Sequence, residues 1–184
     1  MTREEALQAI REHVKNENLI KHMMATEAIM RALARHFGED EETWAMAGLL
    51  HDIDVELTRG DAETHSRLGA EMVKKLGVSD EICHAVLCHN DAHNETFANR
   101  MDKAIYCCDP LTGLITAVAL VYPDKKIAPV EVKSIEKRFR QPKFAAGARR
   151  ETIAACKELL GLELEEFMQI GLDAMKSVAA DLGL

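Results

Sequence analysis

Apolar residues recur at the spacing of an α-helix along nearly the whole chain, and this pattern limits the fold more than any other feature of the sequence. Near the start, Leu7, Ile10 and Val14 follow Thr2 and Glu5, which form a capping-box pattern. No run alternates with a period of two for long enough to predict a strand. Aromatic residues make up only 4% of the chain, which favours helix over sheet. The sequence therefore predicts an all-α bundle of about eight or nine helices.

Cap and turn residues divide the apolar pattern into separate helices. After the first helix we expect helices at about 18–37, 41–56, 64–77, 79–90, from Phe97 onward, 130–139, 145–160 and 163–182. Pro110 should either kink the sixth helix or begin a new one. No repeat, low-complexity tract or Pro/Ser-rich linker interrupts the 184 residues. We therefore expect a single domain over residues 1–184.

The charge balance predicts which large partners the chain does not bind. The net charge is −8 and the pI is near 5.5, whereas a long nucleic acid or an anionic membrane surface requires a positive face. The sequence therefore predicts no long nucleic acid and no membrane among the partners. Small anions stay as candidate partners, because a local cationic pocket can bind them. A second copy of the chain, in a homodimer, also stays as a candidate.

The N-terminal sequence and the cysteines indicate the cellular compartment in which we expect the protein. The segment MTREEALQAIREH lacks the apolar core of a signal peptide, and the most apolar run, 110–122, is too short to span a bilayer. The five cysteines are odd in number and include the neighbours Cys107 and Cys108, which argues against a disulfide framework. We therefore expect a reducing, cytoplasmic setting.

Helical geometry separates the eight histidines into those that face the core and those that do not, because residues three, four and seven apart share a face. His22 lines up with Ile29 and Leu33, whereas His84 lines up with Cys88 on a more polar face. Two aspartates also lie on or beside inward faces. The inward set is His22, His51, Asp52, His65, His89 and Asp109.

Six polar side chains directed into one small helical core need partners. A single histidine on an apolar face is usually a hydrogen-bonded core residue, and an aspartate before a proline is usually a cap or turn residue. Left unpaired, each buried polar group costs roughly 1–3 kcal/mol. The adjacent pair His51 and Asp52 also follows the apolar stretch AMAGLL. A metal satisfies the whole set at once, so the sequence predicts a metal site.

The order of these residues, with His51 and Asp52 in the motif HDID, resembles the HD superfamily of metal-dependent phosphohydrolases, and in particular the members whose motif is HDIG. The resemblance covers about residues 18–122 and implies the helical bundle of an HD domain. Residues 123–184 resemble a C-terminal helical extension of uncharacterised bacterial members, with DPLTGL and KSIEKRF as markers.

The resemblance implies one or two divalent transition metals, and imidazole and carboxylate ligands suit Fe, Mn, Co, Ni or Zn alike. The first metal would be held by His22, His51, Asp52 and Asp109, and the second by His65 and His89 with Asp52 as the bridge. The motif departs from the family at Val55, where many HDIG members have a lysine and mononuclear nucleotidases often have a glutamate. Asp54 or Glu56 would replace that glutamate only with a different geometry.

The implied reaction is hydrolysis of a phosphomonoester or phosphodiester by a metal-activated water, with Asp52 and His51 as catalytic residues. The implied substrate is a small phosphorylated metabolite, above all a nucleotide. Two other functions stay open. One is a metal-containing nucleotide-sensing module without catalysis, and the other is a di-iron oxygenase of the same superfamily.

Basic residues gather between 133 and 150 in a chain that is otherwise acidic. Lys133, Arg138 and Lys143 are the first candidates to bind a substrate phosphate, although the interpretation that we favour is a solvated basic face. The pattern CH-x3-CH at 83–89 suggests a structural zinc. Only His84 and Cys88 of that pattern share a helical face, so the four side chains cannot close around a metal on a regular helix.

Overall fold

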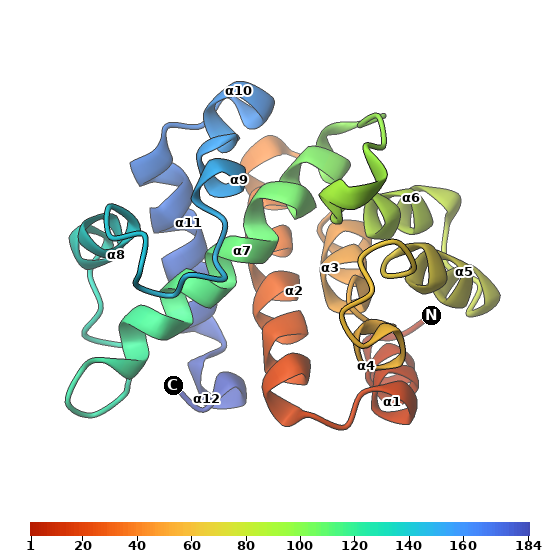
Figure 1. Cartoon of the computed structure of the whole chain (residues 1–184), viewed down its shortest axis with the longest axis horizontal. Coiled ribbons are helices and arrows are strands. Elements are labelled where there is room, and N and C mark those ends of the chain that lie inside the picture. Colours follow the sequence, from red (N-terminus) through yellow and green to blue (C-terminus); the bar gives the residue numbers. More distant parts are fainter.

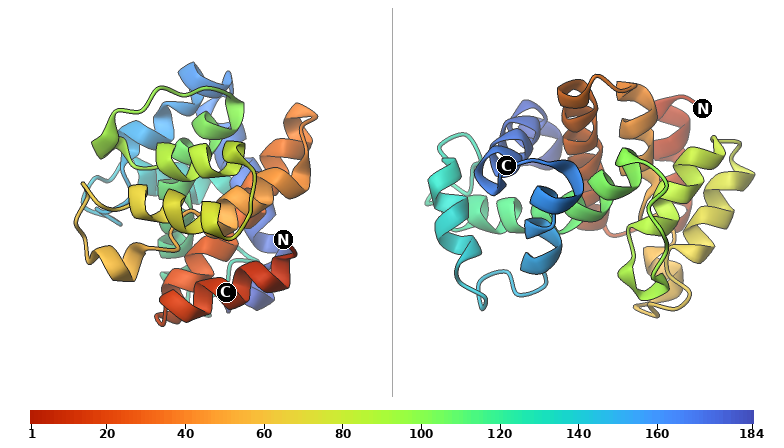
Figure 2. Two further views of the ribbon diagram at one scale, coloured as in Figure 1. Left: turned by 90° about the vertical axis from the view of Figure 1, so that its right-hand side faces the viewer. Right: turned by 90° about the horizontal axis from the view of Figure 1, so that it is seen from above.

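Two long helices, α2 (Glu17–Phe37) and α7 (Arg100–Leu120), run through the middle of the molecule and separate the other helices into two groups (Figure 1). The computed structural model describes all 184 residues. One group lies near the N-terminus and the other near the C-terminus, as the two further views also show (Figure 2). The first group consists of α1 (Arg3–His13), α3 (Glu41–Leu50), α4 (Val55–Thr58), α5 (Arg67–Lys75), α6 (Asp80–Cys88) and the 3-10 turn η1 (Asp91–His93). The second consists of α8 (Val132–Phe139), α9 (Arg150–Ala154), α10 (Cys156–Leu160), α11 (Leu164–Ser177) and α12 (Ala179–Leu182).

The all-α prediction is confirmed, because the chain contains helices and turns but no strand. Eight helices have eight residues or more, in agreement with the expected number, and the other four have only four or five residues. These short helices arise where an expected helix is broken. The expected helix 145–160 divides at Ala155, and the expected helix 163–182 divides at Val178.

Local capping chemistry sets several helix ends as expected. Thr2 and Glu5 form the capping box of α1. Gly38 ends α2 in the left-handed conformation with φ of 72°, and the Ser79 hydroxyl accepts from the Ile82 N–H at the start of α6. Pro110 does not begin a new helix, because α7 continues through it from Arg100 to Leu120.

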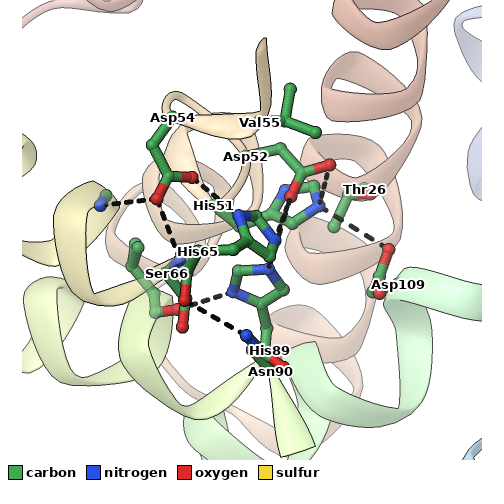
Figure 3. A network of polar contacts seen from close by, with 12 residues as sticks. Thr26, His51, Asp52, Asp54, Val55, His65, Ser66, His89, Asn90 and Asp109 are labelled. Carbon is green, nitrogen blue, oxygen red and sulfur yellow. Dashed lines mark hydrogen bonds and ion pairs between the residues drawn. The ribbon is translucent and has the colours of Figure 1, made fainter. Parts of the chain in front are cut away.

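The largest departure from the expected helices lies at the motif HDID. We expected one helix over 41–56, but α3 ends at Leu50 and residues 51–54 form a turn before α4. His51 keeps helical backbone angles as the C-terminal cap residue, so its side chain still points as the last turn of α3 dictates. The turn places Asp52 and Asp54 on different sides of the chain (Figure 3).

Helices α2 and α3 approach closely at Gly48, next to this motif. A Cβ atom at Gly48 would lie 2.8 Å from the Thr26 carbonyl oxygen and 2.9 Å from the Glu27 nitrogen, both in the backbone of α2. Any larger residue would therefore push the helices apart. This contact brings His51 on α3 to His22 on α2.

The core is continuous from α1 to α12 and consists of 46 buried apolar residues. Helix α7 is long and apolar enough, by length and composition, to cross a membrane, but here most of it is buried inside the protein. All five cysteines are free and buried. The cytoplasmic setting and the division into a core at 18–122 and an extension at 123–184 stay predictions.

Candidate metal centre

The six side chains that the sequence directs inward meet between α2, α3, α6 and α7, although they come from five separate stretches of chain (Figure 3). Each is fixed by the element that carries it. His22 lies on α2, His51 and Asp52 at the end of α3, His65 in the turn before α5, His89 at the end of α6, and Asp109 on α7. His51, Asp52 and His89 are buried, whereas His22, His65 and Asp109 are partly exposed, so the cluster opens to solvent on one side.

Four of these residues form one compact set of ligand atoms around the Nε2 atom of His22. That nitrogen lies 3.0 Å from Asp109 Oδ1, 3.2 Å from His51 Nε2 and 3.5 Å from Asp52 Oδ2. His51 Nε2 lies 3.5 Å from Asp52 Oδ2 and 3.6 Å from Asp109 Oδ1. Ligand atoms about 2.1 Å from one metal are separated by about 3.0–3.4 Å in octahedral or tetrahedral geometry. The ligand atoms of His22, His51 and Asp109 all lie within 4.8 Å of one another, and the five separations of 3.0–3.6 Å in the set that includes Asp52 are close to the spacing of a single metal's ligands.

A second set lies on the other oxygen of Asp52. Asp52 Oδ1 is 3.3 Å from His65 Nε2 and 3.3 Å from His89 Nε2, and these two nitrogens are 3.1 Å apart. Asp52 thus presents Oδ2 to His22 and His51 but Oδ1 to His65 and His89. Figure 3 labels Asp52 and all of these histidines except His22. A carboxylate that divides its oxygens in this way can bridge two metals.

Hydrogen bonds on the far side of each ring fix the four imidazoles. The Nδ1–H groups of His51 and His89 donate to the carbonyl oxygens of Gly48 and Val86. His65 donates to an Asp54 oxygen, and His22 donates to the Thr112 hydroxyl, whose own proton goes to the Asp109 carbonyl. Because every Nδ1 carries a proton, every Nε2 lone pair points into the cluster.

This arrangement fits a divalent metal better than hydrogen bonding alone. Two Nε2 atoms only 3.1 or 3.2 Å apart repel one another unless a cation or a proton lies between them. The donor set contains imidazole and carboxylate groups but no thiolate, which suits divalent first-row metals. The residues therefore fit one metal in each set. Their roles as ligands, and the roles of Asp52 and His51 as catalytic residues, stay predictions.

Asp54, the last residue of HDID, is the supporting residue that sequence reasoning missed. Its carboxylate is fully buried and accepts from the Ser66 N–H at 2.9 Å, the Gly69 N–H at 2.8 Å and His65 Nδ1 at 2.9 Å. Ser66 holds a φ of 67°, which is strained for a residue with a side chain. Asp54 thus holds the turn that carries His65. Its place in the motif marked it, but only the fold shows its partners.

We expect Asp54→Asn to weaken the second metal site selectively. The amide NH2 cannot accept the His65 Nδ1–H, so the imidazole proton moves to Nε2, where the metal would bind. Loss of such a supporting hydrogen bond costs about 10–100-fold in metal affinity. Titration of metal-free protein should show this loss at one of two sites, while Asp61→Asn, an exposed carboxylate in the same turn, leaves both unchanged. Equal affinity in Asp54→Asn and the parent would contradict this role.

The charges of the cluster shift its protonation when no metal is bound. Burial opposes the protonation of His51, but Asp52 and Asp109 outweigh it and raise the pKa of His51 to about 9. In the same way Asp52 and Asp54 overcome burial and raise the pKa of His65 to about 10. Burial raises the pKa of Asp52 and of Asp109, but the neighbouring histidines outweigh it and lower both. Protons therefore compete with metals for the Nε2 atoms.

These shifts predict an unusual pH dependence for metal-free protein. A histidine whose pKa is raised above its unfolded value of about 6.5 contributes stability that is complete below that value and is lost as the pH rises. The melting temperature of metal-free protein should therefore fall between pH 6.5 and about 10, the range set by the raised pKa values of His51 and His65. Thermal melts of metal-saturated protein should lack this decline. A flat profile for the metal-free protein would contradict the charge arrangement.

The three basic residues proposed for phosphate binding lie in and just after α8. Lys133 and Lys143 are exposed, and Arg138 donates to Gln141 and lies over the Phe144 ring. No hydrogen bond or ion pair joins any of them to the six clustered side chains, so their role in substrate binding stays a prediction.

Two cavities instead flank the cluster, and both reach His22 and Gly113. One has a volume of about 560 Å³ and contains Lys21, and the other has about 340 Å³ and contains Arg149. Arg149 also forms an ion pair with Asp91. One cation therefore lines each of the two cavities beside His22. Spacing in the sequence could not single out these two among 23 lysines and arginines.

Comparison with known proteins gives a consistent picture. The family model of the HD domain matches residues 19–137. Ribonuclease Y of Oleidesulfovibrio alaskensis is 33% identical over 76 residues, which are 41% of this chain and 15% of that protein. Ribonuclease Y of Sulfurovum sp. is 25% identical over 139 residues, which are 73% of this chain and 27% of that protein. The chain thus spans only a minor part of the curated relatives that it matches. No solved structure matches it.

These relatives correct one prediction from the sequence. We expected a small phosphorylated partner and no long nucleic acid, yet the relatives are named as ribonucleases, enzymes that act on RNA. The expectation was wrong because the net charge of −8 is an average over the chain. A substrate in an active site contacts only the few groups nearest to it, and an average over the chain does not describe the charge of those groups.

Proposed function

This chain belongs to the HD-domain family of metal-dependent phosphohydrolases, and we propose that it hydrolyses phosphodiester bonds of RNA at a centre of two divalent metals. The observation that carries the two-metal proposal is the division of the Asp52 oxygens between two sets of histidines. RNA as the substrate class is supported by the relatives named ribonuclease Y. The identity of the metals among Fe, Mn, Co, Ni and Zn stays open.

The cavities support a substrate that continues on both sides of the reacting bond. Lys21 lines one cavity and Arg149 the other, with His22 and Gly113 shared between them. A phosphodiester has a nucleoside on each side of its phosphorus, so two cavities that meet at the ligands suit it better than a terminal phosphate. Gly113 has no atom within 4 Å of where its Cβ would lie, so the shared rim is open.

The chain's own residues have separable tasks in this reaction. Metals bound in this centre would lower the pKa of a water molecule and neutralise phosphate oxygens. His22, His51, His65 and His89 direct their Nε2 lone pairs inward because their Nδ1 protons are engaged. Asp52 holds the two sets in register, and Lys21 and Arg149 are placed to bind the phosphates on either side of the reacting one.

Cleavage of a single-stranded RNA oligonucleotide, in the presence of each candidate metal in turn, tests the proposal. We expect internal cleavage by the parent protein and none by Asp109→Asn. Lys21→Ala should raise the KM and reduce the salt dependence of binding by about one phosphate contact. Lys157→Ala, an exposed lysine far along the chain, should change neither.

The alternatives from the sequence give different results in this assay. A protein that holds two metals and binds RNA without cleaving it would be a sensing module. Oxygen consumption without RNA cleavage would indicate a di-iron oxygenase. Either result would overturn the proposed function while leaving the metal centre in place.

A further inference from the structure

A second group of metal-binding side chains lies between α6 and α7, separate from the candidate centre. His84 and Cys88 are one turn apart on α6, and Asp102 lies in the first turn of α7. The Cys88 Sγ atom is 3.5 Å from His84 Nδ1, and that nitrogen is 2.9 Å from Asp102 Oδ2. One ligand atom from each of the three residues lies within 4.8 Å of the others.

The two oxygens of Asp102 have very different surroundings. Oδ2 accepts from the backbone N–H groups of Ala98 and Asn99 and from His84. Oδ1 is buried and has no hydrogen-bond partner, although the Asp102 side chain has no exposed surface at all. Buried carboxylate oxygens are almost always paired. The unpaired oxygen therefore indicates that this cluster binds a ligand, such as a cation, that takes up the lone pair of a carboxylate oxygen.

The charges support a cation rather than a further hydrogen bond. No lysine or arginine pairs with Asp102, and His84 is the one side chain in ion-pair distance of its carboxylate. A zinc ion bound by a thiolate, a carboxylate and a neutral imidazole would be balanced in charge. Zinc bonds of about 2.3 Å to sulfur and 2.0–2.1 Å to nitrogen place the two ligand atoms about 3.6 Å apart in tetrahedral geometry, close to the observed 3.5 Å.

We propose that His84, Cys88 and Asp102 bind a zinc ion that ties the end of α6 to the start of α7. Asp102 Oδ1 is the carboxylate ligand, while Oδ2 keeps its two backbone hydrogen bonds and continues to cap α7. The His84 imidazole gives up its hydrogen bond to Asp102 and binds the metal. A cavity of about 370 Å³ reaches Cys88, and a water molecule from it completes the four ligands without changing the charge balance.

The pattern CH-x3-CH points to this site in part. Cys83 and His89 do not join it, as helical geometry predicts, because His89 turns to the candidate centre. The missing ligand comes instead from α7, where Asp102 lies 14 residues beyond Cys88 in the sequence but in contact with His84. The proposed site is independent of the proposed function.

Cobalt in place of zinc tests the site, because a cysteine thiolate bound to Co²⁺ gives a charge-transfer absorption in the near ultraviolet that imidazole and carboxylate ligands do not give. Metal-free protein titrated with Co²⁺ should develop this band, and Zn²⁺ in excess over all three proposed metal sites should remove it. Cys88→Ser should abolish the band. Cys83→Ser, which changes the neighbouring buried thiol on α6, should keep it, and so should Asp52→Asn, which disrupts only the candidate centre.

His84→Gln provides a second variant in case Cys88→Ser does not fold, and it should weaken Co²⁺ binding at the thiolate site at least about tenfold. Circular dichroism establishes that each variant is folded. No band in folded parent protein at saturating Co²⁺ would overturn the proposal. A band that persists in folded Cys88→Ser would also overturn it, since another thiolate would then be the ligand.

Discussion

Replacing Asp52 with asparagine is expected to lower the rate of RNA hydrolysis by about 10³-fold, the scale seen when a group that stabilises transition-state charge is removed. Asparagine has nearly the same shape but only one oxygen and no charge. Asp52 faces one set of histidines with Oδ2 and the other set with Oδ1. Asparagine can offer an oxygen to only one of the two sets. The metal content of the purified variant, measured with the rate, should fall by at least one ion per chain.

The matched control for this substitution is Asp61→Asn, which makes the same chemical change at an exposed position. It should keep the parent's rate and metal content. An Asp52→Asn protein that is folded, holds two metals and cleaves RNA at the parent's rate would show that the carboxylate is not the bridge.

Removal of the metals is expected to abolish RNA cleavage and to lower the melting temperature by roughly 8–16 °C. Binding at a free metal concentration about 1,000 times the dissociation constant stabilises a protein by about 4 kcal/mol, and each kcal/mol shifts the melting temperature by about 2–4 °C at this chain length. The Nε2 atoms are only 3.2 Å apart in the pair His22 and His51, and 3.1 Å apart in the pair His65 and His89. A metal removes the repulsion between the lone pairs of each pair, so its loss destabilises the fold. Chelator dialysis followed by thermal melts measures the effect.

Addition of metal to the dialysed protein should restore both the melting temperature and RNA cleavage. Because the raised pKa values of His51 and His65 make protons compete with the metal, restoration should need more metal at pH 6 than at pH 8. A dialysed, metal-free protein that melts at the same temperature as the parent would mean that the cluster does not bind metals tightly.

The helical pattern predicted the inward faces of His22 and His89, but it does not account for His65, which lies in the turn before α5 rather than on a helix. His22 and His89 point inward because neighbours three, four and seven residues away are apolar, and burial of those neighbours fixes the face of each helix. The identification of the set did not require the exact helix ends. His51 lies at the end of α3 rather than inside a longer helix, yet its cap position keeps helical angles and therefore the predicted direction.

Contacts between distant segments were not accessible from the sequence. Asp54 accepts hydrogen bonds from the backbone N–H groups of Ser66 and Gly69. The amino-acid sequence of that turn does not show that these N–H groups converge on one carboxylate. Asp102 meets His84 for the same reason, across the packing of α6 on α7. Such partners depend on how helices pack, and helix packing is set by many apolar contacts at once.

The partner prediction failed for a different physical reason. Net charge describes the potential far from a protein, where contributions add, but a substrate that reaches the active site responds to the few groups nearest to it. Lys21 and Arg149 line the cavities beside His22, and Arg149 belongs to the basic stretch 133–150. The roles of Lys133, Arg138 and Lys143 in phosphate binding stay predictions. Density of charge along the sequence therefore pointed to the stretch that contains Arg149 but not to Lys21.

The most direct test of the two-metal centre is the position of the metals in a crystal grown with Mn²⁺, located by anomalous scattering. We predict two peaks, one on each side of Asp52, the first within bonding distance of His22, His51 and Asp109 and the second within bonding distance of His65 and His89. A map without peaks among these six side chains, in protein shown to cleave RNA with Mn²⁺, would contradict the account.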